Sequence, residues 1–288
     1  MMTRLQPPIP LNLPKTSVQP PSHISASTND AGLLFRQKIL HLQALNVNPQ
    51  KALHQNPNFR CTPLSSLLSL EHYLLSLGLS RPAVGRILDM HPKLLTADIP
   101  RDLEPIIDFL LEEVLIPFND LPKSLTRCPR ILVSDLKTQL RPSFKFLVEF
   151  GFKGSHKINC QTTVLLVSSV ERTLKPKIDF LKNLGLSDEE VERMVIRSPG
   201  LLTFSVENNL VPKVDFFIQE MKGDLDELKK FPQYFSFSLE RKIKPRYRIL
   251  VDHGFKLPLA QMLRVSDGEF NARLIEMRLK LAERSSLL

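Results

Sequence analysis

The stretch "SPGLLTFSVENNLVPKVDFF" at 198–217 decides the fold, because its prolines and apolar residues return along the chain at a regular spacing. It joins Pro-x-Leu-Leu to a second proline thirteen residues after the first. Related segments begin at Pro92, Pro129 and Pro232. Pro92 and Pro129 are 37 residues apart, Pro199 and Pro232 are 33 apart, and the gap of 70 from Pro129 to Pro199 is two periods. This spacing predicts an array of helical repeats.

A hidden copy fills the double gap. In "TVLLVSSV" at 163–170, Thr163 replaces the first proline and Leu165-Leu166 occupy the aliphatic positions, and we expect this replacement to loosen only one turn. The second proline keeps its offset in all five copies, as Pro105, Pro142, Pro176, Pro212 and Pro245. The array therefore has at least five units.

Each unit also predicts where a long helix begins. Six residues after the first position stands Asp98, Asp135, Ser169, Ser205 or Ser238, and their side-chain oxygens can accept from the free N–H groups that open a helix. Positions eleven, fifteen and eighteen are apolar or aromatic and share one helical face, which predicts the core. The second proline would lie about two turns inside, so we expect a kink or a short first segment.

A shorter helix should follow each long one. Gly185 suits the end of a long helix, and Ser187 with Glu190 predicts a capping box for the next. "SLGLSRPAVGRILDMHP" at 76–92 repeats the pattern, with Ser80 as cap and Pro82 in the first turn. We expect Pro-x-Leu-Leu to form a single tight turn that leads into the next unit. Stacked units predict a quasi-one-dimensional helical array with a curved, extended surface, capped by a degenerate sixth unit at about 56–91 and a frayed one at 255–284.

The composition limits the possible functions. The net charge of +9 and the pI near 9.5 favour a polyanionic partner or an acidic membrane surface, and no uninterrupted apolar run is long enough for a spanning helix. Cys61, Cys128 and Cys160 lie far apart without a Cys-x-x-Cys pair, and no nucleophile, metal-ligand or phosphate-loop motif is present. We therefore expect neither an enzyme nor a metal or other cofactor.

The N-terminal residues predict a targeting segment. The first 29 residues contain no acidic residue and are rich in Pro, Ser and Thr, which is typical of an organelle transit peptide. Only Arg4 and Lys15 are basic, so a plastid is favoured over a mitochondrion; a disordered tail without an address is the alternative. The predicted organisation is a disordered transit peptide at 1–30, an N-terminal extension at 31–55 and the repeat domain at 56–284.

The repeated pattern resembles that of the mitochondrial transcription termination factor (mTERF) family, common in plant organelles. The resemblance rests on Pro-x-Leu-Leu followed by Leu-x-Pro-Lys-(Val/Ile)-x-Phe-(Leu/Phe), as in 198–217 and in "TTVLLVSSVERTLKPKIDFL" at 162–181, and covers roughly 56–284. It implies an all-α helical-repeat superhelix, shaped like a half-ring and built from motifs of two helices with a short 3₁₀ turn. It also implies nucleic-acid binding along a basic inner surface, in transcription termination or initiation, intron splicing or ribosome assembly. Thr163 and a smaller number of units depart from the longer members, which shortens the expected footprint.

Two sets of basic residues are the predicted nucleic-acid contacts. Positions nine, twelve and sixteen lie opposite the apolar face, and position fourteen on its shoulder could form a second stripe on the inner curve. Basic residues are densest at 229–248. The candidates are Arg141, Lys145, Arg172, Lys175, Lys177, Lys213, Arg241, Lys242, Lys244, Arg246 and Arg248.

The leading interpretation is a monomeric, non-enzymatic organelle protein that binds double-stranded DNA, with the organelle transcription machinery as a further partner. RNA binding in splicing or ribosome assembly is one alternative, and a helical scaffold for proteins is another. Recurring phenylalanines such as Phe109, Phe146, Phe180 and Phe216 are interpreted as packing residues, as are Tyr234 and Phe235, which occupy the Leu-Leu positions.

Overall fold

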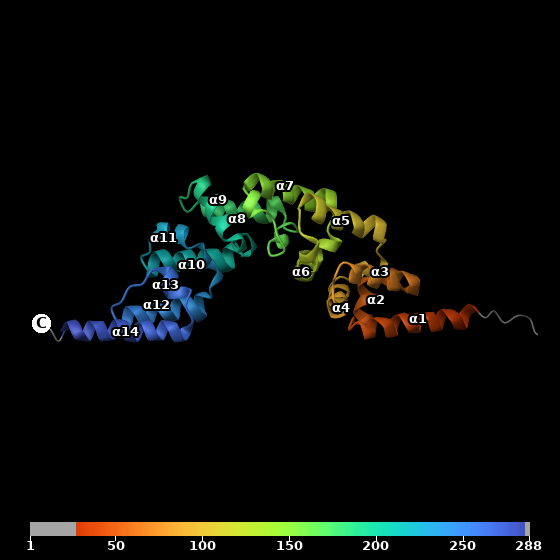
Figure 1. The fold of residues 1–288 in the computed structure, drawn as a ribbon, viewed down its shortest axis with the longest axis horizontal. Coiled ribbons are helices and arrows are strands. Elements are labelled where there is room, and N and C mark those ends of the chain that lie inside the picture. Colours follow the sequence, from red (N-terminus) through yellow and green to blue (C-terminus); the bar gives the residue numbers. More distant parts are fainter. Residues whose placement is uncertain (1–26, 286–288) are drawn as a thin grey trace, which may run out of the picture.

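The structure is a computed structural model and describes residues 27–285. Helices and helical turns make up most of the described part of the chain, and no strand occurs in it. The helices stack into an open arch with the first and last described helices at opposite feet (Figure 1). The prediction of an all-α helical-repeat superhelix is therefore confirmed.

Each of the five predicted long helices consists of a π turn that continues directly into an α-helix. These are η3 (Ile99–Leu103) with α5 (Glu104–Asp108), η7 (Leu136–Leu140) with α7 (Arg141–Phe150), η10 (Val170–Leu174) with α8 (Lys175–Lys182), η12 (Val206–Leu210) with α10 (Val211–Asp215), and η15 (Leu239–Ile243) with α12 (Lys244–Asp252). The predicted helix starts are confirmed, because Asp98, Asp135, Ser169, Ser205 and Ser238 each accept from the N–H three residues ahead.

The π turns explain how a proline fits inside each long helix. Pro142 has no N–H, and in a regular helix its ring would crowd the carbonyl of Thr138. Here the N–H of Leu140 bonds instead to the carbonyl of Asp135, five residues back, which widens the turn just before the proline. In three other units an N–H donates in the same way to the carbonyl five residues back, which belongs to Ser169, Ser205 or Ser238. The predicted short first segment is thus a π turn in every unit.

Long helices end at a residue with positive φ, and the spacing of that residue varies. Gly151, Gly185 and Gly254 stand 22 residues after the first position, whereas Leu115 (φ 61°) and Lys222 (φ 49°) stand 23 after it. Only these two longer units contain a second π turn among the described residues, η4 (Phe109–Glu113) or η13 (Phe216–Glu220). A π turn holds one more residue than an α turn, so it absorbs the insertion and keeps the apolar face in register.

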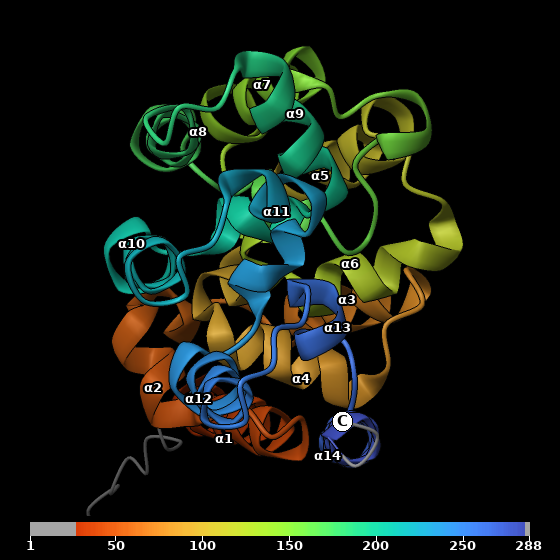
Figure 2. The same ribbon diagram turned by 90° about the vertical axis from the view of Figure 1, so that its left-hand side faces the viewer.

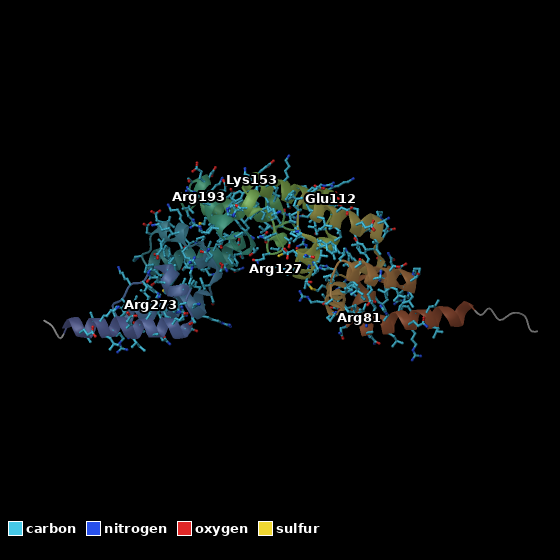
Figure 3. All side chains as sticks on the ribbon, in the orientation of Figure 1. Arg81, Glu112, Arg127, Lys153, Arg193 and Arg273 are labelled. Atoms are coloured by element: carbon cyan, nitrogen blue, oxygen red, sulfur yellow. The ribbon has the colours of Figure 1, made fainter. Side chains whose placement is uncertain are left out.

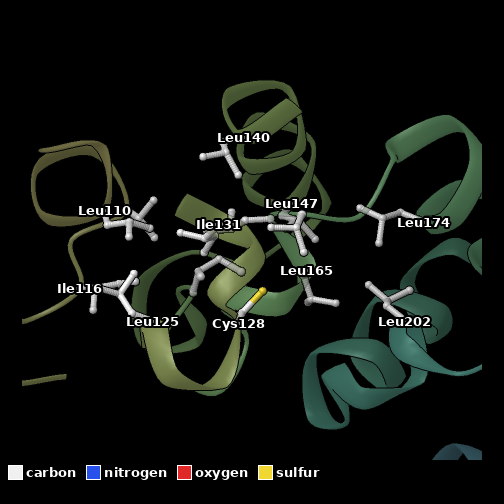
Figure 4. Close-up of a cluster of buried hydrophobic side chains, with 14 of the residues drawn as sticks. Leu110, Ile116, Leu125, Cys128, Ile131, Leu140, Leu147, Leu165, Leu174 and Leu202 are labelled. Atoms are coloured by element: carbon white, nitrogen blue, oxygen red, sulfur yellow. The ribbon is translucent and has the colours of Figure 1, made fainter. Parts of the chain in front are cut away.

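Short α-helices and 3₁₀ turns complete the units. The short helices are α4 (Arg81–Met90), α6 (Leu121–Arg127), α9 (Asp188–Arg197) and α11 (Leu225–Lys230). The turns are η2 (Pro92–Thr96), η6 (Pro129–Val133), η9 (Thr163–Leu165), η11 (Pro199–Thr203) and η14 (Pro232–Ser236). Their paired apolar residues, such as Leu201 and Leu202, are buried, and Leu165 and Leu202 lie in one continuous core with Leu140 and Leu174 of the long helices (Figure 4).

Two capping predictions have different outcomes. Ser187 and Glu190 form the predicted capping box at α9. Ser80 occupies the cap position of α4, but its side chain accepts no capping hydrogen bond. Pro82 lies in the first turn of α4 and has no N–H to offer, which removes one of the usual donors.

The central unit contradicts the prediction of a short helix in every repeat. Between α7 and η9 the chain forms a loop with one 3₁₀ turn, η8 (Gly154–His156). Thr163 is fully buried with its hydroxyl unpartnered, and η9 is shorter than the other Pro-x-Leu-Leu turns. Thr163 was expected to loosen only one turn, and that is wrong because the whole preceding helix is missing. Gly, Ser and Asn across 151–162 disfavour a helix.

Additional helices extend the array at both ends. The N-terminal part comprises α1 (Ser27–Ala44), α2 (Pro49–Gln55), η1 (Pro57–Arg60) and α3 (Leu64–Ser76). The C-terminal part comprises α13 (Leu259–Leu263) and α14 (Asp267–Ser285), and η5 (Phe118–Asp120) precedes α6. The predicted transit peptide (1–30) lies outside the described residues, except that 27–30 begin α1.

The array twists as it curves. In Figure 1, α4 and α6 lie on the inner side of the arch relative to α3 and α5, whereas α9 lies on the outer side of α8. Figure 2, seen from the C-terminal foot, shows the long helices α8, α10 and α12 on one side, with the short helices α9, α11 and α13 beside them. The inner surface is therefore formed by different helices in the two halves.

Candidate nucleic-acid interface

Several predicted cations on the long helices are already paired with carboxylates; Arg141, Lys145 and Lys175 are exposed, and Lys244 is half-buried. Arg141 forms a two-pronged ion pair with Glu113 of the preceding long helix, at 2.6 Å from Nη2 to Oε1, and this hydrogen bond raises the pKa of Arg141. Lys175 lies 2.6 Å from Glu171, and Lys244 lies 2.5 Å from Glu240. Lys145 is 3.9 Å from Glu149. These pairs reduce the positive charge that such residues offer to a phosphate.

Three predicted arginines remain without an anionic partner. Arg172, Arg241 and Arg248 are exposed, and their guanidinium groups have no hydrogen bond or ion pair with another described residue. A free guanidinium offers five N–H donors in a planar fork that suits phosphate oxygens. These three are the strongest candidates among the predicted residues.

The predicted second stripe at position fourteen is wrong. Lys177, Lys213 and Arg246 are 9%, 5% and 4% exposed, so their cationic groups do not line an open surface. Lys177 Nζ donates to the carbonyl of Leu202 at 2.6 Å, and Lys213 Nζ donates to that of Phe235 at 2.5 Å. Arg246 donates to the carbonyls of Met262 and Val265 and forms an ion pair with Asp267.

In the last three units these buried cations join one unit to the next. The acceptors of Lys177 and Lys213, the carbonyls of Leu202 and Phe235, lie in the 3₁₀ turn that begins the next unit. Carbonyls at such a helix end lack a partner within the helix. Ser143 fills the equivalent place with a hydroxyl that donates to the carbonyl of Ser168. Lys38 of α1 donates to the carbonyls of Phe59 and Arg60 in η1 and of Thr62 just after it. Burial lowers the pKa of Lys177 and Lys38, and that of Lys213 to about 8. Their role is structural.

Lys242 is also less available than predicted. It is half-buried, its Nζ lies 4.9 Å from the centre of the Phe237 ring, and it reaches the carbonyl of Val265 at 3.4 Å. The basic cluster at 229–248 therefore divides into structural and free cations.

The sequence interpretation missed a set of cations on the short helices. On each short helix, the residues six and two positions before the following proline share one face. They are Arg86 and Met90 on α4, Lys123 and Arg127 on α6, Arg193 and Arg197 on α9, and Asp226 and Lys230 on α11. Residues four apart share a helical face, so the spacing was a usable signal. Arg86 donates to the carbonyl of Thr126 and Arg197 to those of Lys229 and Lys230, so each arginine bridges two short helices. Arg127 is exposed and has no side-chain partner in the described part of the chain.

The twist of the array separates these cations. Figure 3 shows Arg127 on the inner side of the arch, whereas Arg193 and Lys153 lie on the outer side. Short-helix cations thus face inward only in the N-terminal half, where α4 and α6 lie inside.

Other kinds of site receive no support from the described residues. They contain no group of three or more His, Cys, Asp or Glu side chains placed to hold a metal, and none of their helices could cross a membrane. Cys61, Cys128 and Cys160 are free thiols, and burial raises the pKa of Cys128.

A curved array of two-helix units joined by Pro-x-Leu-Leu turns, with cations along both helix types, defines a helical-repeat protein suited to a polyanion. The mTERF family model matches residues 70–271, so this chain belongs to the mTERF family.

The relatives carry transcription-factor names and are longer proteins. "Transcription termination factor MTERF4, chloroplastic" of Arabidopsis thaliana is 35% identical over 38% of this chain and 20% of its own length. "Transcription termination factor MTERF8, chloroplastic" of the same plant is 27% identical over 67% of this chain and 38% of its own. "Transcription termination factor 4, mitochondrial" of Mus musculus is 26% identical over 51% and 42%. These names agree with the predicted plastid address and with its mitochondrial alternative.

Proposed function

We propose that this protein is a plastid nucleic-acid-binding protein that lies along double-stranded DNA and regulates organelle transcription. The observation that supports it best is the set of exposed arginines without a carboxylate partner, Arg127, Arg172, Arg241 and Arg248, on an mTERF array. Such cations release counterions from phosphates and bind with little sequence information. We expect the bound form to be a monomer, with the transcription machinery as a further partner.

The aromatic residues favour a duplex over a single strand. Proteins that hold single strands stack bases on exposed aromatic rings. Phe118 is the only exposed aromatic side chain in the described part of the chain, and the repeated phenylalanines pack into or against the core. The alternatives of RNA binding in splicing or ribosome assembly, and of a protein scaffold, are separated from this proposal by experiment.

The test is a titration of the full chain with duplex DNA, duplex RNA and single-stranded RNA of one sequence at several salt concentrations. We expect the tightest binding to duplex DNA, with a steep salt dependence. Preference for single-stranded RNA would favour the splicing alternative, and binding to none of the three would favour the scaffold. Crosslinking in intact plastids, followed by sequencing of the recovered DNA and RNA, identifies the target.

A further inference from the structure

A basic groove runs between α4 and α6 in the N-terminal half. It has a volume of about 520 Å³ and is lined by Arg86, Lys123 and Arg127, with Ser80 and Thr126 among its other residues. Arg127 lies on the inner side of the arch (Figure 3), where α4 and α6 are the inner helices. The groove thus opens towards the surface that a bound duplex would follow.

The three cations of this groove are held to different degrees. Arg86 is anchored, because its Nη2 donates to the carbonyl of Thr126 at 2.9 Å and so ties α4 to α6. Lys123 makes an exposed ion pair with Asp120 at 3.0 Å, which water screens. Arg127 has no partner among the described residues. One fixed and two movable cations therefore face the groove, and no carboxylate lines it.

The groove between α9 and α11 has the same construction but a different charge and position. Arg197 ties the two helices together through the carbonyls of Lys229 and Lys230, as Arg86 does between α4 and α6. Here Glu190 and Asp226 line the groove and both pair with Lys229. Arg193 of this groove lies on the outer side of the arch (Figure 3). The chain thus contains a natural control.

We infer that the α4–α6 groove is a backbone-phosphate site, in which Lys123 and Arg127 bind adjacent phosphates of one strand, and that the α9–α11 groove is not. This inference rests on the proposed nucleic-acid function and assigns a particular place to the contact. Because the inner surface changes from short helices to long helices across the central unit, the backbone meets short-helix cations only in the N-terminal half.

The lining favours phosphate over an acidic protein segment. A peptide usually anchors through apolar side chains that enter a hydrophobic pocket. The groove contains no exposed large apolar residue, since Leu79 is buried and Ala83 and Pro122 are half-buried. Charge without an apolar anchor suits a phosphodiester backbone.

The experiment compares two double variants of the full chain that remove the same net charge. Lys123→Gln with Arg127→Gln alters the α4–α6 groove, and Arg193→Gln with Lys230→Gln alters the α9–α11 groove. None of these four side chains is buried, so melting curves should match the wild type. Each protein is titrated with a fluorescent DNA duplex at several salt concentrations.

We expect the first variant to bind roughly tenfold more weakly and its salt slope to flatten by about 1.8, from two contacts at about 0.9 each, while the second stays close to wild type. Equal loss in both variants would mean that only net charge matters and would overturn the site. A first variant that binds duplex normally but loses binding to polyglutamate would assign the groove to an acidic peptide instead. If the wild type binds no duplex, the result contradicts the proposed function itself.

Discussion

The ammonium group of Lys213 is buried between two repeats, where it donates to the carbonyl of Phe235 in the next unit at 2.5 Å and to Asn209 Oδ1 at 3.0 Å. Tyr234, the neighbour of Phe235, donates its hydroxyl back to the carbonyl of Lys213 at 3.0 Å. The two units are therefore joined by reciprocal hydrogen bonds within the core, which explains why position fourteen is basic although its side chain is buried.

This burial predicts a pH-dependent contribution to stability. The pKa of Lys213 falls to about 8 because burial disfavours the charged form, whereas the unfolded chain keeps the ordinary value of 10.5. Between these values the unfolded state binds more protons than the folded state, so the free energy of unfolding rises with pH. From pH 8 to pH 10.5 the free energy of unfolding of the wild type should rise by on the order of 1 kcal/mol more than that of a Lys213→Met variant, as measured by denaturant unfolding.

The comparison isolates one side chain, because other titrating groups contribute equally to both proteins. Lys145→Met serves as the control, since it makes the same substitution at an exposed position. A constant difference between wild type and Lys213→Met across this window would mean that Lys213 titrates as if it were in water.

The positive-φ residues that end the long helices predict two stabilising substitutions. A non-glycine residue in this conformation costs about 1–2 kcal/mol, and glycine gives back roughly 0.4–1 kcal/mol through a freer unfolded chain. Leu115 and Lys222 are both exposed, so Leu115→Gly and Lys222→Gly remove little packing. Each should raise the free energy of unfolding by about 0.5–1 kcal/mol, measured by chemical denaturation.

Gly185→Ala provides the reverse experiment. Gly185 has a φ of +89° and nothing within 4 Å of the position of an added Cβ, so an alanine there tests backbone strain alone. The free energy of unfolding of this variant should be about 1 kcal/mol lower than that of the wild type. Stability that does not change at any of the three positions would show that the helix ends relax without strain.

The spacing of residues predicted the repeat unit well, because caps and apolar positions act within one helix. Position eleven, for example, is Leu103, Leu140, Leu174, Leu210 or Ile243, and each is fully buried. Position fourteen could not be assigned in this way. The acceptor for Lys213 lies 22 residues further along the chain, and only the stacking of the next unit brings it close.

The candidate site was harder to predict than the fold, because the twist of the array decides which cations face inward. Arg127 and Arg193 stand on equivalent faces of short helices, yet they lie on opposite sides of the arch (Figure 3). The missing short helix at 151–162 was readable from its Gly, Ser and Asn content, but the periodicity of the surrounding repeats concealed it.

In the basic segment at 229–248, we expect the exposed cations to bind nucleic acid and the buried one to stabilise the fold. Arg241 and Arg248 are exposed and unpaired in the described chain, whereas Arg246 is 4% exposed, bonds to Met262 and Val265 and pairs with Asp267. Arg241→Gln with Arg248→Gln should leave the melting temperature unchanged. If both contact phosphates, its salt slope for duplex binding should flatten by up to about 1.8.

Arg246→Gln should show the opposite behaviour, because glutamine cannot reach all three acceptors and leaves buried carbonyls unsatisfied. We expect a loss of about 2–4 kcal/mol in the free energy of unfolding, with the salt slope kept wherever the protein remains folded. Melting curves and salt titrations on both variants measure the two quantities separately. A flattened salt slope in the folded Arg246→Gln variant would show that Arg246 contacts the nucleic acid. An unchanged slope in the double variant would move the C-terminal contact to Arg172 and the neighbouring α8.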